Sequence, residues 1–352
     1  MDLILNNPTI FDVAKKAIAP RTIKLWRSSP VETEELTSVD SRGVPGNAVL
    51  ASARQGLTEA VTHLGLHRTD YVGIPDYGSH CIIDFLGRKA TPVPVRFLPP
   101  SSAAAVLIYD QWGWQKSPVA RAEVRKEFRD AKVIWDRVDS LPVSFQREAE
   151  AGESEAEVQV FSLKKTLTAS GGGLVWLRGL KWLERNLDDD RDLVAALEQM
   201  VKNFGQSQRI DDKVQAFICN ECDFHMRLQD WLQRFCIDDA ADQEHQARRV
   251  RMESCARHML APTLPSWMRD QLENTDMPAP GIWPVRINTA QDHLLAEISR
   301  SFHFEARLYH FNFNDSYLNQ HWTRVLGLPL HSELGLDLLE EFLMYLRNLN
   351  DV

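Results

Sequence analysis

Short apolar runs alternate with helix-like segments from about residue 47 onward, and this alternation most constrains the fold. Such a pattern favours an α/β fold, in which a mostly parallel sheet is covered by helices. We expect strands at 71–74, 103–109, 133–135, 158–161 and 174–177, an extended segment at 91–97, and helices at 51–64, 81–87 and 119–128.

The rest of the chain has a different pattern. Residues 178–260 are mostly helical in pattern without a strand signal, and prolines then crowd a linker between 262 and 284. A chain of 352 residues can bury one large and one smaller core. We expect a large domain, 1–260, with an irregular segment at 1–45, and a small α+β domain, 261–352. The small domain should contain strands near 283–287 and 306–311 and helices near 291–301 and 336–349.

Composition excludes several function classes. The net charge is −9 and no block of Lys and Arg occurs, which argues against a nucleic-acid groove and against an anionic membrane surface. No apolar run reaches the roughly 18–20 residues that a membrane span requires. The amino-terminal residues lack the features of a signal peptide, and five cysteines are few. We therefore expect a protein of the reducing cytoplasm.

Two ionisable residues, an acid and an amine, lie where predicted strands end. Asp136 closes the apolar run 131–136, and Lys165 follows the expected strand at 158–161. Ligands of parallel sheets bind at the carboxyl ends of the strands, so these side chains should meet at one edge, together with the loops after Ile74 and Tyr109. A lysine beside Ser162 and ahead of the glycines 171–173 suits a Schiff-base cofactor that carries a phosphate.

Several short motifs, in order and at matching spacing, carry a family resemblance. The segment 165–175, KTLTASGGGLV, is similar to the family pattern K-[NT]-I-T-T-G-E-G-G-M-V. Residues 51–57 stand where the family has its phosphate turn, 110–113 resemble its H-x-Y-G strand end, and 74–80 with 90–93 resemble its V-P-S-F-T-F…A-T-P-V segment. LPLH at 328–331 adds a carboxyl-terminal match. The chain thus resembles the fold-type I pyridoxal-phosphate enzymes, and within them the DegT/DnrJ/StrS sugar aminotransferases.

The resemblance implies a fold and an activity. The fold would be a three-layer α/β/α large domain with a mostly parallel sheet, followed by a small α+β domain. The cofactor would be pyridoxal 5'-phosphate. The enzyme would be a cytoplasmic homodimer that transfers an amino group, with glutamate as the donor, to a nucleotide-linked keto-sugar.

The resemblance also implies roles for single residues. Lys165 would form the Schiff base and carry protons at the substrate carbon, with Lys164 as the alternative lysine. Asp136 would keep the pyridine nitrogen protonated. Ser162 would bind the phosphate, and so would the turn that contains Ala53 and Arg54 at a helix amino terminus.

Two aromatic residues and one carboxylate complete the predicted site. Either His80 or Tyr77 would stack on the cofactor ring, and the motif does not choose between them. Asp139 replaces a glutamine that contacts the ring hydroxyl oxygen in the family. A carboxylate beside that oxygen requires one of the two groups to carry a proton.

Other interpretations stay open. The substrate could be a small amino or keto acid, whose carboxylate Arg286 or Arg307 would bind. The chain could instead be a scaffold of the same fold that has lost turnover, an interpretation that Asp139 and Asp223 favour. A third interpretation is a structural zinc site, for which Cys219, Cys222, Cys255 and His258 have suitable spacing.

Overall fold

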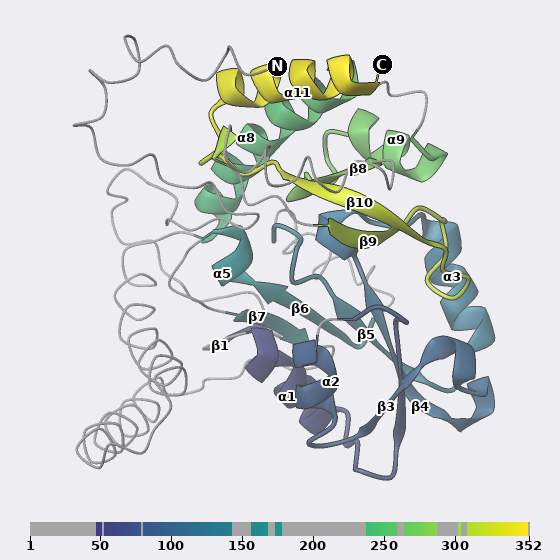
Figure 1. Ribbon diagram of the computed structural model, residues 1–352. Coiled ribbons are helices and arrows are strands. Elements are labelled where there is room, and N and C mark those ends of the chain that lie inside the picture. Colours follow the sequence, from purple (N-terminus) through teal and green to yellow (C-terminus); the bar gives the residue numbers. More distant parts are fainter. Residues whose placement is uncertain are drawn as a thin grey trace, which may run out of the picture.

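The computed structural model describes most of the expected elements (Figure 1). The described residues are 47–50, 53–78, 80–142, 156–167, 173–177, 237–258, 264–286, 302–303 and 308–350. The predictions for residues 1–45 and 291–301, and those for Cys219, Cys222, Asp223 and Arg307, lie outside these ranges.

Seven described strands form one sheet in the order β1-β7-β6-β5-β4-β2-β3. Neighbours from β3 to β6 pair in parallel, whereas β7 runs antiparallel to both β6 and β1. The predicted, mostly parallel sheet is therefore confirmed. The bounds are β1 Asn47–Leu50, β2 Tyr71–Ile74, β3 Thr91–Pro94, β4 Ala103–Tyr109, β5 Lys132–Asp136, β6 Val158–Ser162 and β7 Gly173–Leu177.

Helices cover both faces of this sheet and produce the predicted three layers. On one face, α1 (Ala53–His63) and α2 (His80–Leu86) pack their apolar residues against β2, β4, β5 and β6. On the other face, α3 (Pro118–Glu127) packs Ala120 and Val124 against β4 and β5. The start of α3 follows from local chemistry, because the Ser117 side chain accepts from the Ala120 N–H and a proline occupies the first helical position.

A second, antiparallel sheet of three described strands has the order β8-β10-β9. Its strands are β8 Ile282–Arg286, β9 Leu308–Asn312 and β10 Trp322–Pro329. The helices α8 (Ile237–His258), α9 (Ser266–Glu273) and α11 (Leu336–Asn350) lie around it in Figure 1. Their apolar side chains share one core with the sheet, and this core also takes in Trp112 and Trp114 from the segment after β4.

The domain boundary at residue 260 stays a prediction. The helix α8 precedes that boundary, yet it contributes Met252 and Cys255 to the core around the three-stranded sheet. Burial raises the pKa of the Cys255 thiol far above its ordinary range, as expected for a cysteine that acts as a small apolar side chain.

Several local predictions were wrong. The extended segment predicted at 91–97 ends as a strand at Pro94 and continues as the 3-10 turn η1 (Val95–Phe97). The segment 262–284, predicted to be a linker, contains α9, which buries Trp267 and Met268. The strands β1 and β10 were not predicted, since β1 is short and the first half of β10 contains Thr323 and Arg324. Among the described helices, none is long and apolar enough to cross a membrane.

Candidate active site

Strand register brings the predicted site residues to one edge of the large sheet. Tyr109, the last residue of β4, pairs with Asp136, the last residue of β5. Asp136 in turn pairs with Val160 of β6, and the short helix α5 (Leu163–Thr166) follows β6 directly. Because these strands are parallel, Tyr109, Asp136 and Lys165 all lie at their carboxyl ends.

A buried carboxylate, Asp139, connects these elements. One of its oxygens, Oδ1, lies 2.8 Å from the Lys165 ammonium nitrogen. The other, Oδ2, accepts from the Tyr109 hydroxyl and, at 3.1 Å, from the Trp112 N–H. Trp112 has a φ of 61°, in the left-handed region, and this conformation belongs to the turn that presents its N–H to Asp139. Burial and the neighbouring Asp139 raise the pKa of Tyr109 well above its ordinary value.

The second carboxylate, Asp136, is buried, and only one of its two oxygens accepts a hydrogen bond from the described residues. Its Oδ1 accepts from the Val138 N–H at 3.1 Å, while its Oδ2 has no hydrogen-bond partner within the described part of the chain. Burial raises the pKa of Asp136 to about 7, although the Lys165 ammonium acts in the opposite direction. An unengaged, buried acceptor of this kind suits a partner that brings its own N–H.

The helix α5 is held at both of its ends. At its amino terminus, the Ser162 hydroxyl accepts from the Lys165 backbone N–H at 3.4 Å. At the other end, the Thr166 carbonyl accepts from the Arg248 guanidinium at 3.4 Å, which ties α5 to α8. The Thr166 hydroxyl also donates to the Ser162 carbonyl at 2.8 Å. The Lys165 side chain is about one third exposed at this edge of the sheet.

The candidate phosphate turn lies beside the same strands. Ala53 and Arg54 begin α1, which contacts β6 and β7. Arg54 is partly buried, and its guanidinium lies 5.7 Å from the centre of the Phe85 ring. Leu50, at the end of β1, pairs with Gly173 of β7, which pairs with Ser162 of β6, so the start of α1 lies near the strand that leads into α5. The side chain of the alternative lysine, Lys164, lies outside the described part of the structure.

The two candidates for ring stacking have different settings. Tyr77 is exposed and stacks on His310 of β9, with ring centres 4.7 Å apart, while Trp322 of β10 meets it edge-on at 5.1 Å. His80 begins α2, but its side chain is not among the described ones. Arg286, a candidate for carboxylate binding, has its guanidinium 4.2 Å from the Phe313 ring centre.

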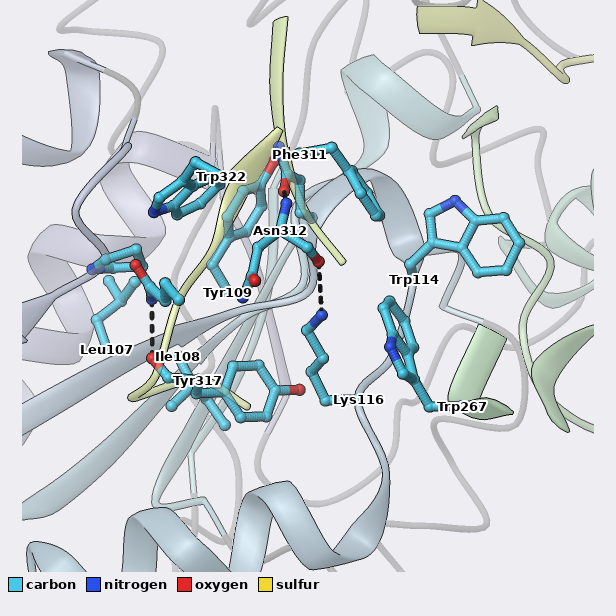
Figure 2. A pocket seen from close by; sticks show the side chains of 13 residues that line it. Leu107, Ile108, Tyr109, Trp114, Lys116, Trp267, Phe311, Asn312, Tyr317 and Trp322 are labelled. Atoms are coloured by element: carbon cyan, nitrogen blue, oxygen red, sulfur yellow. Dashed lines mark hydrogen bonds between the residues drawn. The ribbon is translucent and has the colours of Figure 1, made fainter. Parts of the chain in front are cut away.

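Sequence reasoning missed a lysine that lines a small pocket between β4 and the three-stranded sheet (Figure 2). Lys116 is buried, and its ammonium donates to the carbonyls of Asn312, at 2.8 Å, and Asn314. It also lies 3.7 Å from the centre of the Trp267 ring. Burial lowers the pKa of Lys116 to about 7. Nothing in its local sequence distinguishes this lysine from a surface lysine.

Comparisons with known proteins agree with this architecture. A family model described as "Putative PLP-dependent aminotransferase" matches residues 41–336. The chain is similar to DesI, solved "in the presence of its TDP-sugar product", at 19% identity over 87% of this chain and 81% of that one, with a TM-score of 0.52. It is also similar to "Putative sugar aminotransferase Spr1654 from Streptococcus pneumoniae, PLP-form", at 13% identity over 88% of each chain, with a TM-score of 0.54. At these identities the solved structures establish a shared fold and nothing finer. A comparison with curated proteins found no match to the sequence.

Proposed function

The chain belongs to the PLP-dependent aminotransferase family, and from this premise we propose that it aminates a nucleotide-linked keto-sugar with Lys165 as its reactive lysine. Its fold class and its cofactor, pyridoxal 5'-phosphate, agree with those predicted from the sequence. The observation that carries the assignment of the site is the convergence of Lys165 with Asp136, whose Oδ2 is buried without a hydrogen-bond partner among the described residues.

The two residues would divide the chemistry between them. When bound, pyridoxal phosphate accepts the amino group and takes up electrons from the substrate carbon. The Lys165 side chain is one third exposed at the sheet edge, and its amine would bond to a carbonyl carbon and would carry a proton at the substrate carbon. The Asp136 carboxylate would accept a hydrogen bond from a protonated ring nitrogen through its unengaged oxygen, and the resulting ion pair would offset the cost of its burial.

The phosphate of the cofactor would lie between two helix amino termini. Ser162 caps α5, and its hydroxyl oxygen has a proton to donate to a phosphate oxygen. The start of α1, with Ala53 and Arg54, provides backbone N–H groups and a guanidinium beside β6 and β7. Tyr77 and His80, in the segment that follows β2, are the candidates for contact with the ring face.

The acceptor and the donor follow from the family resemblance. DesI, which was solved with its TDP-sugar product, shares this fold and supports a nucleotide-linked sugar as the acceptor. The "Putative sugar aminotransferase Spr1654" from Streptococcus pneumoniae shares the fold as well and supports a sugar substrate. We take glutamate as the amino donor and a cytoplasmic homodimer as the working assembly.

The first test of this proposal is spectroscopic. Purified protein with added pyridoxal phosphate should develop a visible absorption band, and borohydride should convert the complex into a stable covalent adduct detectable by intact mass. Lys165→Ala should abolish the adduct, whereas Lys164→Ala, as the matched control, should retain it. An adduct that survives in Lys165→Ala but disappears in Lys164→Ala would overturn the assignment of the lysine.

The substrate class needs a separate assay. Protein loaded with the amino form of the cofactor should return to the aldehyde form when a nucleotide-linked keto-sugar is added, and glutamate should regenerate the amino form. Conversion by small keto acids alone, with no response to any nucleotide-linked sugar, would contradict the proposed acceptor and favour the small-acid interpretation.

A further inference from the structure

The position of Asp139 bears on the protonation of the Lys165 amine, which the proposed function leaves open. We propose that Asp139 is a positioning residue that holds the Lys165 amine as an ammonium ion, and thereby sets the pH above which Lys165 couples to an aldehyde. The inference rests on the proposed function, because it concerns the same lysine. In the resembling family this position is a glutamine, which carries no charge.

The contacts of Asp139 divide cleanly between its two oxygens. Oδ1 receives the Lys165 ammonium at 2.8 Å, and Oδ2 receives the Tyr109 hydroxyl and the Trp112 N–H. Asp139 is fully buried, so its interaction with the ammonium is little screened by water, and its two oxygens accept hydrogen bonds from three donors.

Asp139 is also fixed in place by its own segment. Ser140 N–H donates to the Arg137 carbonyl at 2.9 Å, which closes a turn around the residue. On the other side, a Cβ added to Gly113 would lie only 3.0 Å from the Asp139 carbonyl oxygen, so backbone is packed against backbone there. The backbone of Asp139 is therefore held on both sides, and its buried carboxylate meets a lysine side chain that is about one third exposed.

The chemical consequence concerns one proton. An ammonium nitrogen has no lone pair, so Lys165 must release a proton to solvent before its nitrogen can bond to an aldehyde carbon. The nearby carboxylate opposes that release by stabilising the charged amine. Asp136 on β5 acts in the same direction through its charge, and Tyr109 on β4 acts through its hydrogen bond to Asp139.

The test compares the pH dependence of coupling in wild type and Asp139→Asn. The initial rate of adduct formation with pyridoxal phosphate, trapped by borohydride and counted by mass, is measured between pH 6 and 10. Asp139→Asn should couple roughly 10-fold faster than wild type at pH 7 and should stay faster throughout this range, because the Lys165 amine of wild type releases its proton about 1 pH unit or more higher. Asp84→Asn, an exposed carboxylate on α2, is the control for net charge and should match wild type.

A second measurement does not need the cofactor. Reductive methylation with formaldehyde modifies only uncharged amines, and peptide mass spectrometry follows each lysine separately. Normalised to its own plateau, Lys165 in wild type should reach half-modification at a higher pH than the exposed Lys126 of α3. Asp139→Gln should remove that difference.

The outcomes separate this inference from the proposed function. If Lys165 couples to pyridoxal phosphate but wild type, Asp139→Asn and Asp139→Gln share one pH profile, the inference is wrong while the function stands. If no adduct forms on Lys165 at any pH, the proposed function fails, and the methylation profile alone decides whether Asp139 holds the ammonium.

Discussion

The Tyr317 hydroxyl donates to Asp110 Oδ1 at 2.6 Å, and this bond joins the end of β4 to the connection between β9 and β10. Both residues are buried, and the Arg137 guanidinium lies 3.8 Å from the other Asp110 oxygen. Burial raises the pKa of Asp110, whereas Arg137 and the hydrogen bond from Tyr317 lower it. The ionised form of this buried carboxyl is therefore stabilised by these two partners. The contact links the strand that leads to the candidate site with the three-stranded sheet.

Removal of the Tyr317 hydroxyl should therefore weaken the fold. We expect Tyr317→Phe to lower the free energy of unfolding by about 1–3 kcal/mol, because a buried carboxylate oxygen loses its donor. Urea denaturation measures the change. Tyr71→Phe, on an exposed ring, is the control and should stay within about 0.5 kcal/mol of wild type. Equal stabilities of Tyr317→Phe and wild type would show that the bond contributes nothing net.

Local pattern was sufficient for the central strands of the large sheet. The strands β2, β4, β5 and β6 are short apolar runs with both faces covered, and such runs have few alternatives to a parallel, buried strand. The edge at which Asp136 and Lys165 meet follows from that topology alone. For this reason the placement of both residues could be predicted without knowledge of any side-chain contact.

Tertiary contacts account for what the sequence did not reveal. The burial of Lys116 depends on carbonyls of Asn312 and Asn314, which are almost two hundred residues away in the chain. The ion pair between Asp139 and Lys165 also depends on side-chain geometry, which spacing does not determine. The helix α9 was missed because prolines surround it, although Pro265 immediately precedes it and is compatible with a helix start.

The raised pKa of Asp136 predicts a pH-dependent stability. Because this pKa is about 7 in the folded protein and near 4 in an unfolded chain, the folded state binds more protons between these values, and wild type loses stability as pH rises through that window. Asp136→Asn has no such group. Measured without cofactor, it should equal or trail wild type at pH 4.5 and exceed it by on the order of 3 kcal/mol at pH 8. A difference in unfolding free energy between the two proteins that stays constant from pH 4.5 to pH 8 would contradict the raised pKa of Asp136.

The turn beside Asp139 requires glycine at one position. Gly113 has a φ of +85°, and an added Cβ would meet three backbone atoms, including the Asp139 oxygen at 3.0 Å and the Pro280 Cα at 3.1 Å. We expect Gly113→Ala to cost at least about 2 kcal/mol, because both the conformation and the space are unfavourable. Gly335→Ala, where an added Cβ meets nothing within 4 Å, is the matched control and should change thermal stability little. Similar melting temperatures for the two variants would contradict this account.

The lowered pKa of the buried Lys116 amine predicts the opposite dependence of stability on pH. Its pKa is about 7 in the folded protein and near 10.5 in an unfolded chain, so the unfolded state binds more protons between these values. Stability contributed at this position should therefore rise with pH from 7 to 10, by up to about 1.4 kcal/mol for each pH unit. Lys116→Met keeps an unbranched apolar stem but does not titrate, so the free-energy difference between wild type and this variant isolates the effect.

Chemical denaturation at pH 6.5, 8 and 9.5 measures that difference. At pH 6.5 wild type should be at its least stable relative to Lys116→Met, because the buried ammonium costs stability there and its hydrogen bonds to the Asn312 and Asn314 carbonyls only partly offset the cost. As pH rises, the free energy of unfolding of wild type should increase relative to that of Lys116→Met, because the neutral amine keeps its N–H donors and no longer carries a charge. Lys126→Met, on the exposed side of α3, should show no such trend. A flat difference for Lys116→Met would mean that the amine keeps its proton throughout and that the carbonyls and the Trp267 ring compensate its burial in full.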